Sequence, residues 1–268
     1  MVKHTMALQP HYIETSVGRI AVYVNHVAND AVPIIVLHGV YFDHHMWDYH
    51  VSHIEDRTTI AIDMPWHGRS KERIIENWSL ENCTEMLLEI LDSLGIQRVL
   101  AVGHSWGSMT ILRAAHVHPE RFAAIGLCNI PFQASSMVRN MLFRLQHTLL
   151  GFREFYTLQT AKTLFGKQAL REESSLLAAL QRPMDVLSDE QIRHIDTTVI
   201  VRARDTSAML ASVPVNALAL RGEEDYVPVP PNTIETIHVK GGHVSPLEQP
   251  EHVLRLITKL TSFDTHKR

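Results

Sequence analysis

A chain of 268 residues, of which 45% are hydrophobic, is long enough for one α/β domain with a sizeable core, or for such a core with an insertion. Its 25 basic and 29 acidic side chains nearly balance, and a formal net charge of −4 gives no electrostatic basis for binding nucleic acid or an anionic membrane surface. No stretch is apolar over the length of a signal peptide or a membrane span, so we expect a cytoplasmic protein.

The cysteine and histidine patterns predict neither a disulfide nor a metal site. Cys83 and Cys128 fall within a predicted helix and a predicted strand, where we expect them as small core residues. Several of the 18 histidines lie between positions 44 and 53, but their spacing matches no zinc pattern. We therefore expect no metal and no cofactor.

The N-terminal part of the chain predicts strands. Two short ones at 12–15 and 19–25 flank Val17-Gly18 and are typical of a hairpin. Continuously apolar runs follow at 33–39 and 58–63, as expected for strands buried on both faces of a sheet.

Helices then alternate with strands. Apolar residues recur at helical spacing between Ser79, a predicted N-cap, and Gly95, a predicted C-cap. A buried strand begins at Val99, a helix follows it, and another strand covers 121–129. This alternation predicts a parallel sheet with helices on both faces and ligands at the carboxyl ends of the strands.

From about residue 132 to 212 the pattern is helical only, and a strand pattern resumes at 214–220. No glycine-rich or serine- and proline-rich linker sets this region apart. We therefore predict a core formed by residues 1–131 and 213–268, with residues 132–212 inserted as helices; the alternative is that these helices only extend the core.

Ser105 lies at a sharp bend between a strand and a helix, in the stretch VLAVGHSWG from residue 99 to 107. Gly103 and Gly107 flank it at two-residue spacing, which a tight bend requires because side chains there would collide with neighbouring backbone. The bend is expected to expose the serine hydroxyl at the carboxyl edge of the sheet.

This G-x-S-x-G stretch resembles the nucleophile elbow of the α/β-hydrolase family. Two further segments are similar to motifs of the family: the turn DMPWHGRS at 63–70, in which Trp66 replaces a glycine, and the loop KGGHVSPLEQPE at 240–251. The resemblance implies a mostly parallel central sheet flanked by helices, with a helical cap at 132–212 over the active site.

The resemblance also implies a catalytic triad, in the chain order Ser105, Asp225, His243 that the family uses. Serine is a poor nucleophile at neutral pH, so His243 would accept its proton and Asp225 would orient and stabilise the imidazolium. Glu224 adjoins Asp225 and remains an alternative acid.

Backbone N–H groups of Val40 and Trp106 are expected to form the oxyanion hole. Further residues are expected to line the substrate pocket, either beside the catalytic loops or on the cap. They are His38, Trp47, Trp106, Met137 and Met141.

The segment between the predicted acid and histidine is short. Only eighteen positions separate Asp225 from His243, whereas relatives usually fit a full helix there. We expect no multi-turn helix between Pro228 and Thr236. The absence of this helix would leave the sheet edge or the nearby surface open to a partner.

These features predict a serine hydrolase that cleaves a carboxylic ester or lactone with a hydrophobic acyl or small aromatic group through an acyl-enzyme. Alternatives that share the triad are a carbon–carbon bond hydrolase, a cofactor-free haloperoxidase and a slow-turnover, receptor-like binding protein. The expected partner is a small-molecule substrate, with neither nucleic acid nor a membrane span, and the cap helices could mediate a homodimer.

Overall fold

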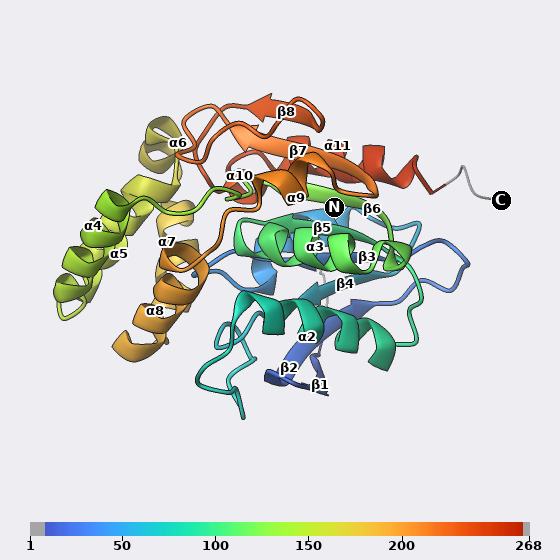
Figure 1. The fold of residues 1–268 in the computed structure, drawn as a ribbon, viewed down its shortest axis with the longest axis horizontal. Helices are drawn as coiled ribbons and strands as arrows, with labels where there is room; N and C mark the ends of the chain where they lie inside the picture. Colours follow the sequence, from blue (N-terminus) through green and yellow to red (C-terminus); the bar gives the residue numbers. More distant parts are fainter. Residues whose placement is uncertain (1–8, 265–268) are drawn as a thin grey trace.

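The protein folds around one eight-stranded sheet, and the computed structural model describes residues 9–264 (Figure 1). The strand order is β1-β2-β4-β3-β5-β6-β7-β8. β1 and β2 form the expected antiparallel hairpin, β2 also pairs antiparallel with β4, and all other neighbours are parallel. The strands are β1 (His11–Thr15), β2 (Gly18–Asn25), β3 (Ile34–Leu37), β4 (Thr59–Ile62), β5 (Val99–His104), β6 (Phe122–Cys128), β7 (Asn216–Gly222) and β8 (Glu235–Val239).

Helices cover the sheet. α2 (Leu80–Ser93) and α3 (Trp106–Val117) pack against each other, and α3 contacts β5 and β6; both lie in front of the strands in Figure 1. α11 (Pro250–Thr261) packs against β5, β6 and β7 and contacts α1 (Asp48–Ser52). β3 to β6 are buried along their whole length, which explains their continuously apolar sequences.

The predicted ends of α2 are confirmed. The Ser79 side chain accepts a hydrogen bond from the backbone N–H of Asn82, and the Asn82 side chain bonds back to the Ser79 N–H. Gly95 follows the helix with φ +69°, the left-handed conformation that glycine adopts most easily. Cys83 and Cys128 are free and buried, as expected for core residues.

Residues 132–212 are helical except for short connections. The helices are α4 (Met137–Gln146), α5 (Arg153–Leu164), α6 (Lys167–Glu172), α7 (Ser174–Met184), α8 (Asp189–Asp196) and α9 (Ser207–Ala211), with short helical turns at His147–Leu149 and Thr197–Val201. Figure 1 shows α4 to α8 grouped beside one end of the sheet, whereas α9 contacts α3. The Phe132 carbonyl accepts the N–H of Thr206 at 2.7 Å, which brings the two ends of the α4–α8 excursion together.

The crossover from β7 to β8 contains no helix between residues 223 and 234, so the expectation of a shortened crossover is confirmed. β8 is the last strand in the sheet order, and its residues are partly exposed. Among residues 9–264, no helix combines the length and apolar character needed to cross a bilayer.

Candidate active site

The bend at Ser105 has the strained geometry expected from its sequence. Ser105 adopts φ +49° and ψ −110° between β5 and α3. A Cβ at Gly103 would overlap the backbone of Gly107, and a Cβ at Gly107 would overlap the carbonyl of Leu37. Both flanking glycines are therefore required for the sheet and α3 to approach each other at this turn.

The structure brings the three predicted catalytic side chains into one hydrogen-bonded chain. His243 Nε2 lies 2.9 Å from Ser105 Oγ, and His243 Nδ1 lies 2.8 Å from Asp225 Oδ1. All three residues are buried, with exposed fractions of 8% for Ser105, 2% for His243 and 6% for Asp225. Glu224 is not part of this chain, because its carboxylate accepts the backbone N–H of Lys167.

Asp225 is held in its ionised form. Burial alone would raise the pKa of its carboxyl, but the charge and hydrogen bond of His243, together with donors from Asn129 and the Val227 N–H, lower the pKa below its ordinary value. The Asp225 carboxylate accepts a hydrogen bond from His243 Nδ1–H, so Nε2 is left with a lone pair directed at Ser105.

Asn129 supports Asp225, and we did not predict its role from the sequence. Its side-chain amide donates to Asp225 Oδ2 at 2.8 Å and to the Gly242 carbonyl at 3.2 Å, and its Oδ1 accepts the Ser245 N–H. Asn129 follows β6 with φ +51°, a conformation in which asparagine is enriched. Its position at the carboxyl end of a predicted strand is the sequence feature that could have indicated a role in the site.

Two rings enclose His243. Burial and the neighbouring His243 lower the pKa of His104 to about 3, so His104 is neutral and its Nε2–H donates to the His243 carbonyl at 2.7 Å. The Tyr226 ring lies 4.5 Å from the His243 ring. His104 thus holds the His243 backbone and Tyr226 packs against the imidazole, and both residues lie next to predicted site residues in the sequence.

The two predicted oxyanion donors are available. Trp106 is the first residue of α3, so its N–H has no acceptor within the helix, and Val40 lines the cavity at Ser105. Among residues 9–264, neither N–H donates to another protein group.

Buried histidines fix the loop that carries Val40. His38 Nδ1–H donates to the Gly39 carbonyl and Nε2 accepts the Met64 N–H, while His67 Nε2 accepts the Tyr41 N–H. Burial lowers the pKa of His38 to about 3 and that of His67 to about 4, so both rings are neutral and can accept these bonds.

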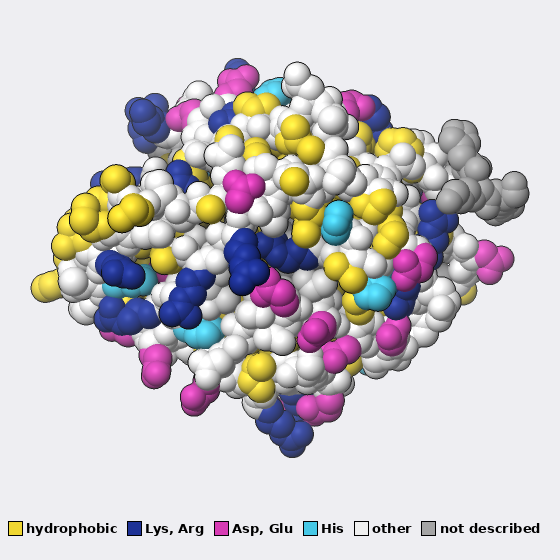
Figure 2. Space-filling model, viewed as in Figure 1, with side chains coloured by type: hydrophobic (Ala, Val, Ile, Leu, Met, Phe, Trp, Pro, Cys, Tyr) yellow, Lys and Arg dark blue, Asp and Glu magenta, His cyan; other side chains and the backbone are white. Residues whose placement is uncertain are grey.

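The structure places the five expected substrate-binding side chains outside the cavity at Ser105, which corrects that expectation. His38, Trp47 and Trp106 are fully buried; His38 fixes the loop described above, and the Trp106 ring stacks on Trp78 at 5.0 Å. Met137 and Met141 lie on the outer face of α4, with exposed fractions of 89% and 63%. Figure 2 shows apolar side chains gathered on this outer side of the helical segment.

The cavity at Ser105 is small and adjoins a larger one. The first has a volume of about 60 Å³ and the second about 270 Å³, and apolar side chains predominate in both. The second is lined by α4 and α5 residues such as Leu142, Phe143 and Tyr156. The following residues line both: Tyr41, Arg139, Leu164, Ile200 and Tyr226.

A buried polar cluster ties the helical segment to the loop after β3. Asp196 of α8 is fully buried and accepts hydrogen bonds from the Tyr41 hydroxyl, from the Tyr156 hydroxyl at 3.0 Å and from His147 Nε2 at 2.8 Å. Since Tyr41 follows Val40, Asp196 couples the position of α8 to the loop that carries an expected oxyanion donor.

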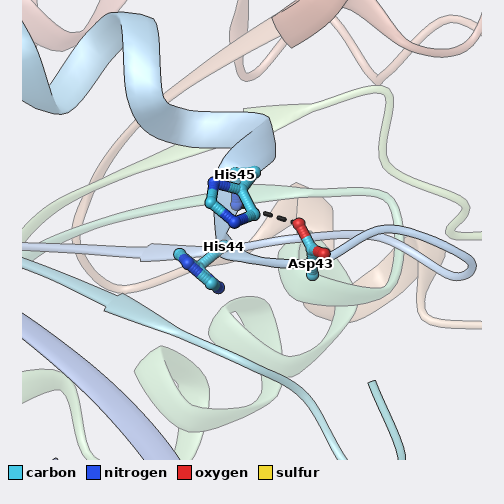
Figure 3. A group of neighbouring side chains, drawn as sticks. All are labelled: Asp43, His44 and His45. Carbon is cyan, nitrogen blue, oxygen red and sulfur yellow. Dashed lines mark hydrogen bonds between the residues drawn. The ribbon is translucent and has the colours of Figure 1, made fainter. Parts of the chain in front are cut away.

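Asp43, His44 and His45 could each offer one ligand atom to a metal within 4.8 Å of one another (Figure 3). Each side chain already has a protein partner: Asp43 accepts from Arg182, His44 bonds to Asp63, and His45 bonds to Asp48. A metal would have to replace all three interactions, so we assign the trio a structural role at the start of the short helix His44–Trp47.

Comparisons with known proteins agree with this architecture. A family model described as the alpha/beta hydrolase fold matches residues 32–218. Epoxide hydrolase 1 of Caenorhabditis elegans is 25% identical over 111 residues, which are 41% of this chain and 28% of that protein. The matched segments cover less than a third of the length of such curated relatives, so they indicate only a shared segment.

Two solved structures are similar over nearly the whole chain. The enol-lactonase from Burkholderia xenovorans LB400 has a TM-score of 0.82 at 18% identity, covering 94% of this chain and 100% of its own. The carboxylesterase CesB from Bacillus subtilis has a TM-score of 0.77 at 22% identity, covering 96% of this chain and 92% of its own. At such identities the likeness establishes a common fold.

Proposed function

The chain belongs to the α/β-hydrolase family, and from this premise we propose that it is a serine hydrolase that cleaves a carboxylic ester or lactone through an acyl-enzyme. The observation that carries the proposal is the chain of hydrogen bonds from Asp225 through His243 to Ser105 at the base of a cavity. The names of the similar structures, an enol-lactonase and a carboxylesterase, point in the same direction.

In the first half-reaction Ser105 Oγ attacks the carbonyl carbon of the substrate while His243 Nε2 accepts the hydroxyl proton. Asp225 stabilises the imidazolium, which then gives its proton to the departing alcohol oxygen as the carbon–oxygen bond breaks. In the second half-reaction water loses a proton to His243 and attacks the acyl-enzyme, which releases the carboxylic acid and restores the Ser105 hydroxyl.

The tetrahedral oxyanion is stabilised by the N–H groups of Val40 and Trp106. Trp106 also lies at the N-terminus of α3, where the helix dipole favours negative charge. His38 and His67 hold the Val40 loop in place before substrate arrives, so no reorganisation is needed when the charge develops.

Residues 132–212 form the cap of this enzyme and supply most of the substrate contacts. Cap residues contribute Leu142, Phe143 and Ile200 to the cavities, and these apolar walls suit a hydrophobic acyl or small aromatic group. The side chains that set acyl preference are therefore Leu142 and Phe143, which line the second cavity, in place of Met137 and Met141, which line neither cavity.

Intact-mass labelling with a fluorophosphonate probe tests the proposal. We expect one adduct on the wild type, none on Ser105→Ala and much slower labelling of His243→Ala. Ser135 lines the same cavity and provides a matched control, because Ser135→Ala should label at the wild-type rate. Equal labelling of Ser105→Ala, or no labelling of the wild type together with no turnover of activated esters, would refute the assignment.

A further inference from the structure

The two adjoining cavities at Ser105 contain one permanent charge. Among the described residues that line them there is no aspartate or glutamate, and Arg139 of α4 is the sole lysine or arginine. The histidines there are His104, which burial keeps neutral, and His243 of the proposed triad. Arg139 is therefore the only permanent charge among the described lining residues, whereas the carboxylates of Asp196 and Asp225 lie behind the walls, bonded to lining side chains.

Arg139 sits where the two cavities meet. It lines both of them, and its guanidinium carbon lies 5.4 Å from the centre of the Tyr226 ring. The Tyr226 ring lies in turn 4.5 Å from the His243 ring. The cation is thus separated from the proposed catalytic imidazole by a single aromatic side chain.

The guanidinium has no carboxylate partner among residues 9–264. Among the other arginines of the cap, Arg153 pairs with Asp189 at 2.6 Å and Arg182 pairs with Asp43 at 3.0 Å, whereas Arg144 and Arg171, like Arg139, have no carboxylate partner among the described residues. Within these residues the Arg139 guanidinium makes no hydrogen bond and lies over the Tyr226 ring, so its planar set of N–H donors is free for a ligand.

Neutral polar groups complete this environment. Gln133 lines the cavity at Ser105, and Gln146, Thr160 and Thr163 line the second one. Donors of this kind can support an anion held by a guanidinium, whereas the apolar walls around them accommodate the carbon chain of the substrate.

We propose that the substrate carries a carboxylate remote from its scissile ester or lactone bond, and that Arg139 binds this carboxylate and so sets substrate specificity. The inference rests on the proposed function, because it assumes that Ser105 reacts with an ester or lactone. It narrows the expected substrates from hydrophobic acyl compounds in general to those that also carry an anionic group at one end. A charge-assisted hydrogen bond of this type corresponds to a preference of about tenfold to a hundredfold.

The test compares kcat/KM for two matched esters: the mono-4-nitrophenyl ester of glutaric acid and the same compound with its free carboxylate capped as a methyl ester. A second pair carries the carboxylate, free or methyl-capped, on the alcohol part of the ester, and this distinguishes which side of the scissile bond Arg139 faces. We expect the wild type to prefer the free carboxylate in one of these pairs by about tenfold or more.

Variants assign the preference to Arg139. Arg139→Gln should reduce the ratio between free and capped esters by at least about tenfold, and Arg139→Lys should retain part of it. Arg144→Gln is the matched control, because Arg144 lies on the same helix, is exposed and lines neither cavity; it should keep the wild-type ratio. Added salt should reduce the ratio for the wild type more than for Arg139→Gln, since Arg139 is exposed.

Several outcomes would overturn the inference. A wild type that hydrolyses free and capped esters equally well would refute it and leave the proposed function standing. A ratio that is unchanged in Arg139→Gln, or lowered equally in Arg144→Gln, would also refute it and leave Arg139 as a cation that only packs on Tyr226. Failure of the proposed function is distinguishable, because no ester would then be hydrolysed and Ser105 would not be labelled.

Discussion

Mild acid should destabilise this protein through a set of buried histidines. Burial lowers the pKa of each of four side chains to about 3 or about 4, well below the ordinary value of 6.5; they are His38, His50, His67 and His104. Between these folded pKa values and 6.5, the unfolded chain binds more protons than the folded protein. Their contribution to stability is therefore complete above about pH 6.5 and is lost as the pH falls toward 4.

The magnitude follows from the linkage relation. Between pH 7 and pH 5, a histidine with a folded pKa near 4 and an unfolded pKa near 6.5 contributes a loss of about 2 kcal/mol. Four such groups give an upper bound of about 8 kcal/mol, against a total stability of about 5–15 kcal/mol for a typical protein. Glu248 acts in the opposite direction, because burial raises the pKa of its carboxyl, so the measured loss should fall below this bound.

Urea unfolding followed by tryptophan fluorescence at pH 7 and pH 5 measures this loss. His50→Leu provides the internal test: His50 is fully buried against Trp47, far in sequence from the proposed triad, and leucine fills a similar volume without titrating. In this variant the loss in the free energy of unfolding between pH 7 and pH 5 should be smaller than in the wild type by about 2 kcal/mol. An unchanged pH dependence in His50→Leu, or equal wild-type stability at both pH values, would refute the reasoning.

Three further predictions concern single contacts. Asp196→Asn should lower the free energy of unfolding in urea by about 3 kcal/mol, because the carboxylate that accepts three buried donors is lost. A loss under about 1 kcal/mol would show that the cluster does not anchor the helices of residues 132–212. Asn129→Ala should lower kcat/KM for an activated ester by about tenfold, since Asp225 loses a donor; wild-type kcat/KM would contradict this. Gly107→Ala should lower the free energy of unfolding by about 3 kcal/mol or prevent folding, because its Cβ would overlap Leu37. Gly151→Ala is the control: Gly151 has open space around it, so this variant should unfold like the wild type.

The proposed triad illustrates what a sequence can predict. Gly103 and Gly107 restrict the backbone around Ser105, and strand ends of a parallel sheet meet at one edge, so a serine, an acid and a histidine that each follow a strand converge there. The alternation of strands and helices from β3 to β6 predicted the sheet for the same reason. The sequence also predicted the shortened crossover before β8, because its length and prolines leave no room for a helix.

The lining of the substrate cavity depended on tertiary packing. Helical periodicity groups Met137 and Met141 on one face of α4 but does not specify which face turns inward, and the packing of α4 leaves both exposed. Trp106 adjoins Ser105 in the chain, yet the first turn of α3 directs its ring onto Trp78. The choice between Asp225 and Glu224 was likewise made by the fold, through the direction of each side chain.

The sequence by itself therefore determined the sheet, the bend at Ser105 and the choice of His243 for the proposed triad, because short-range backbone constraints and strand order fix these features. Only the tertiary structure decided that Asn129 bonds to Asp225, that Asp196 reaches Tyr41 and that Arg139 lies over Tyr226. Each of these pairs joins residues far apart in the chain, and such contacts are set by how the helices of residues 132–212 and the loops pack against the sheet.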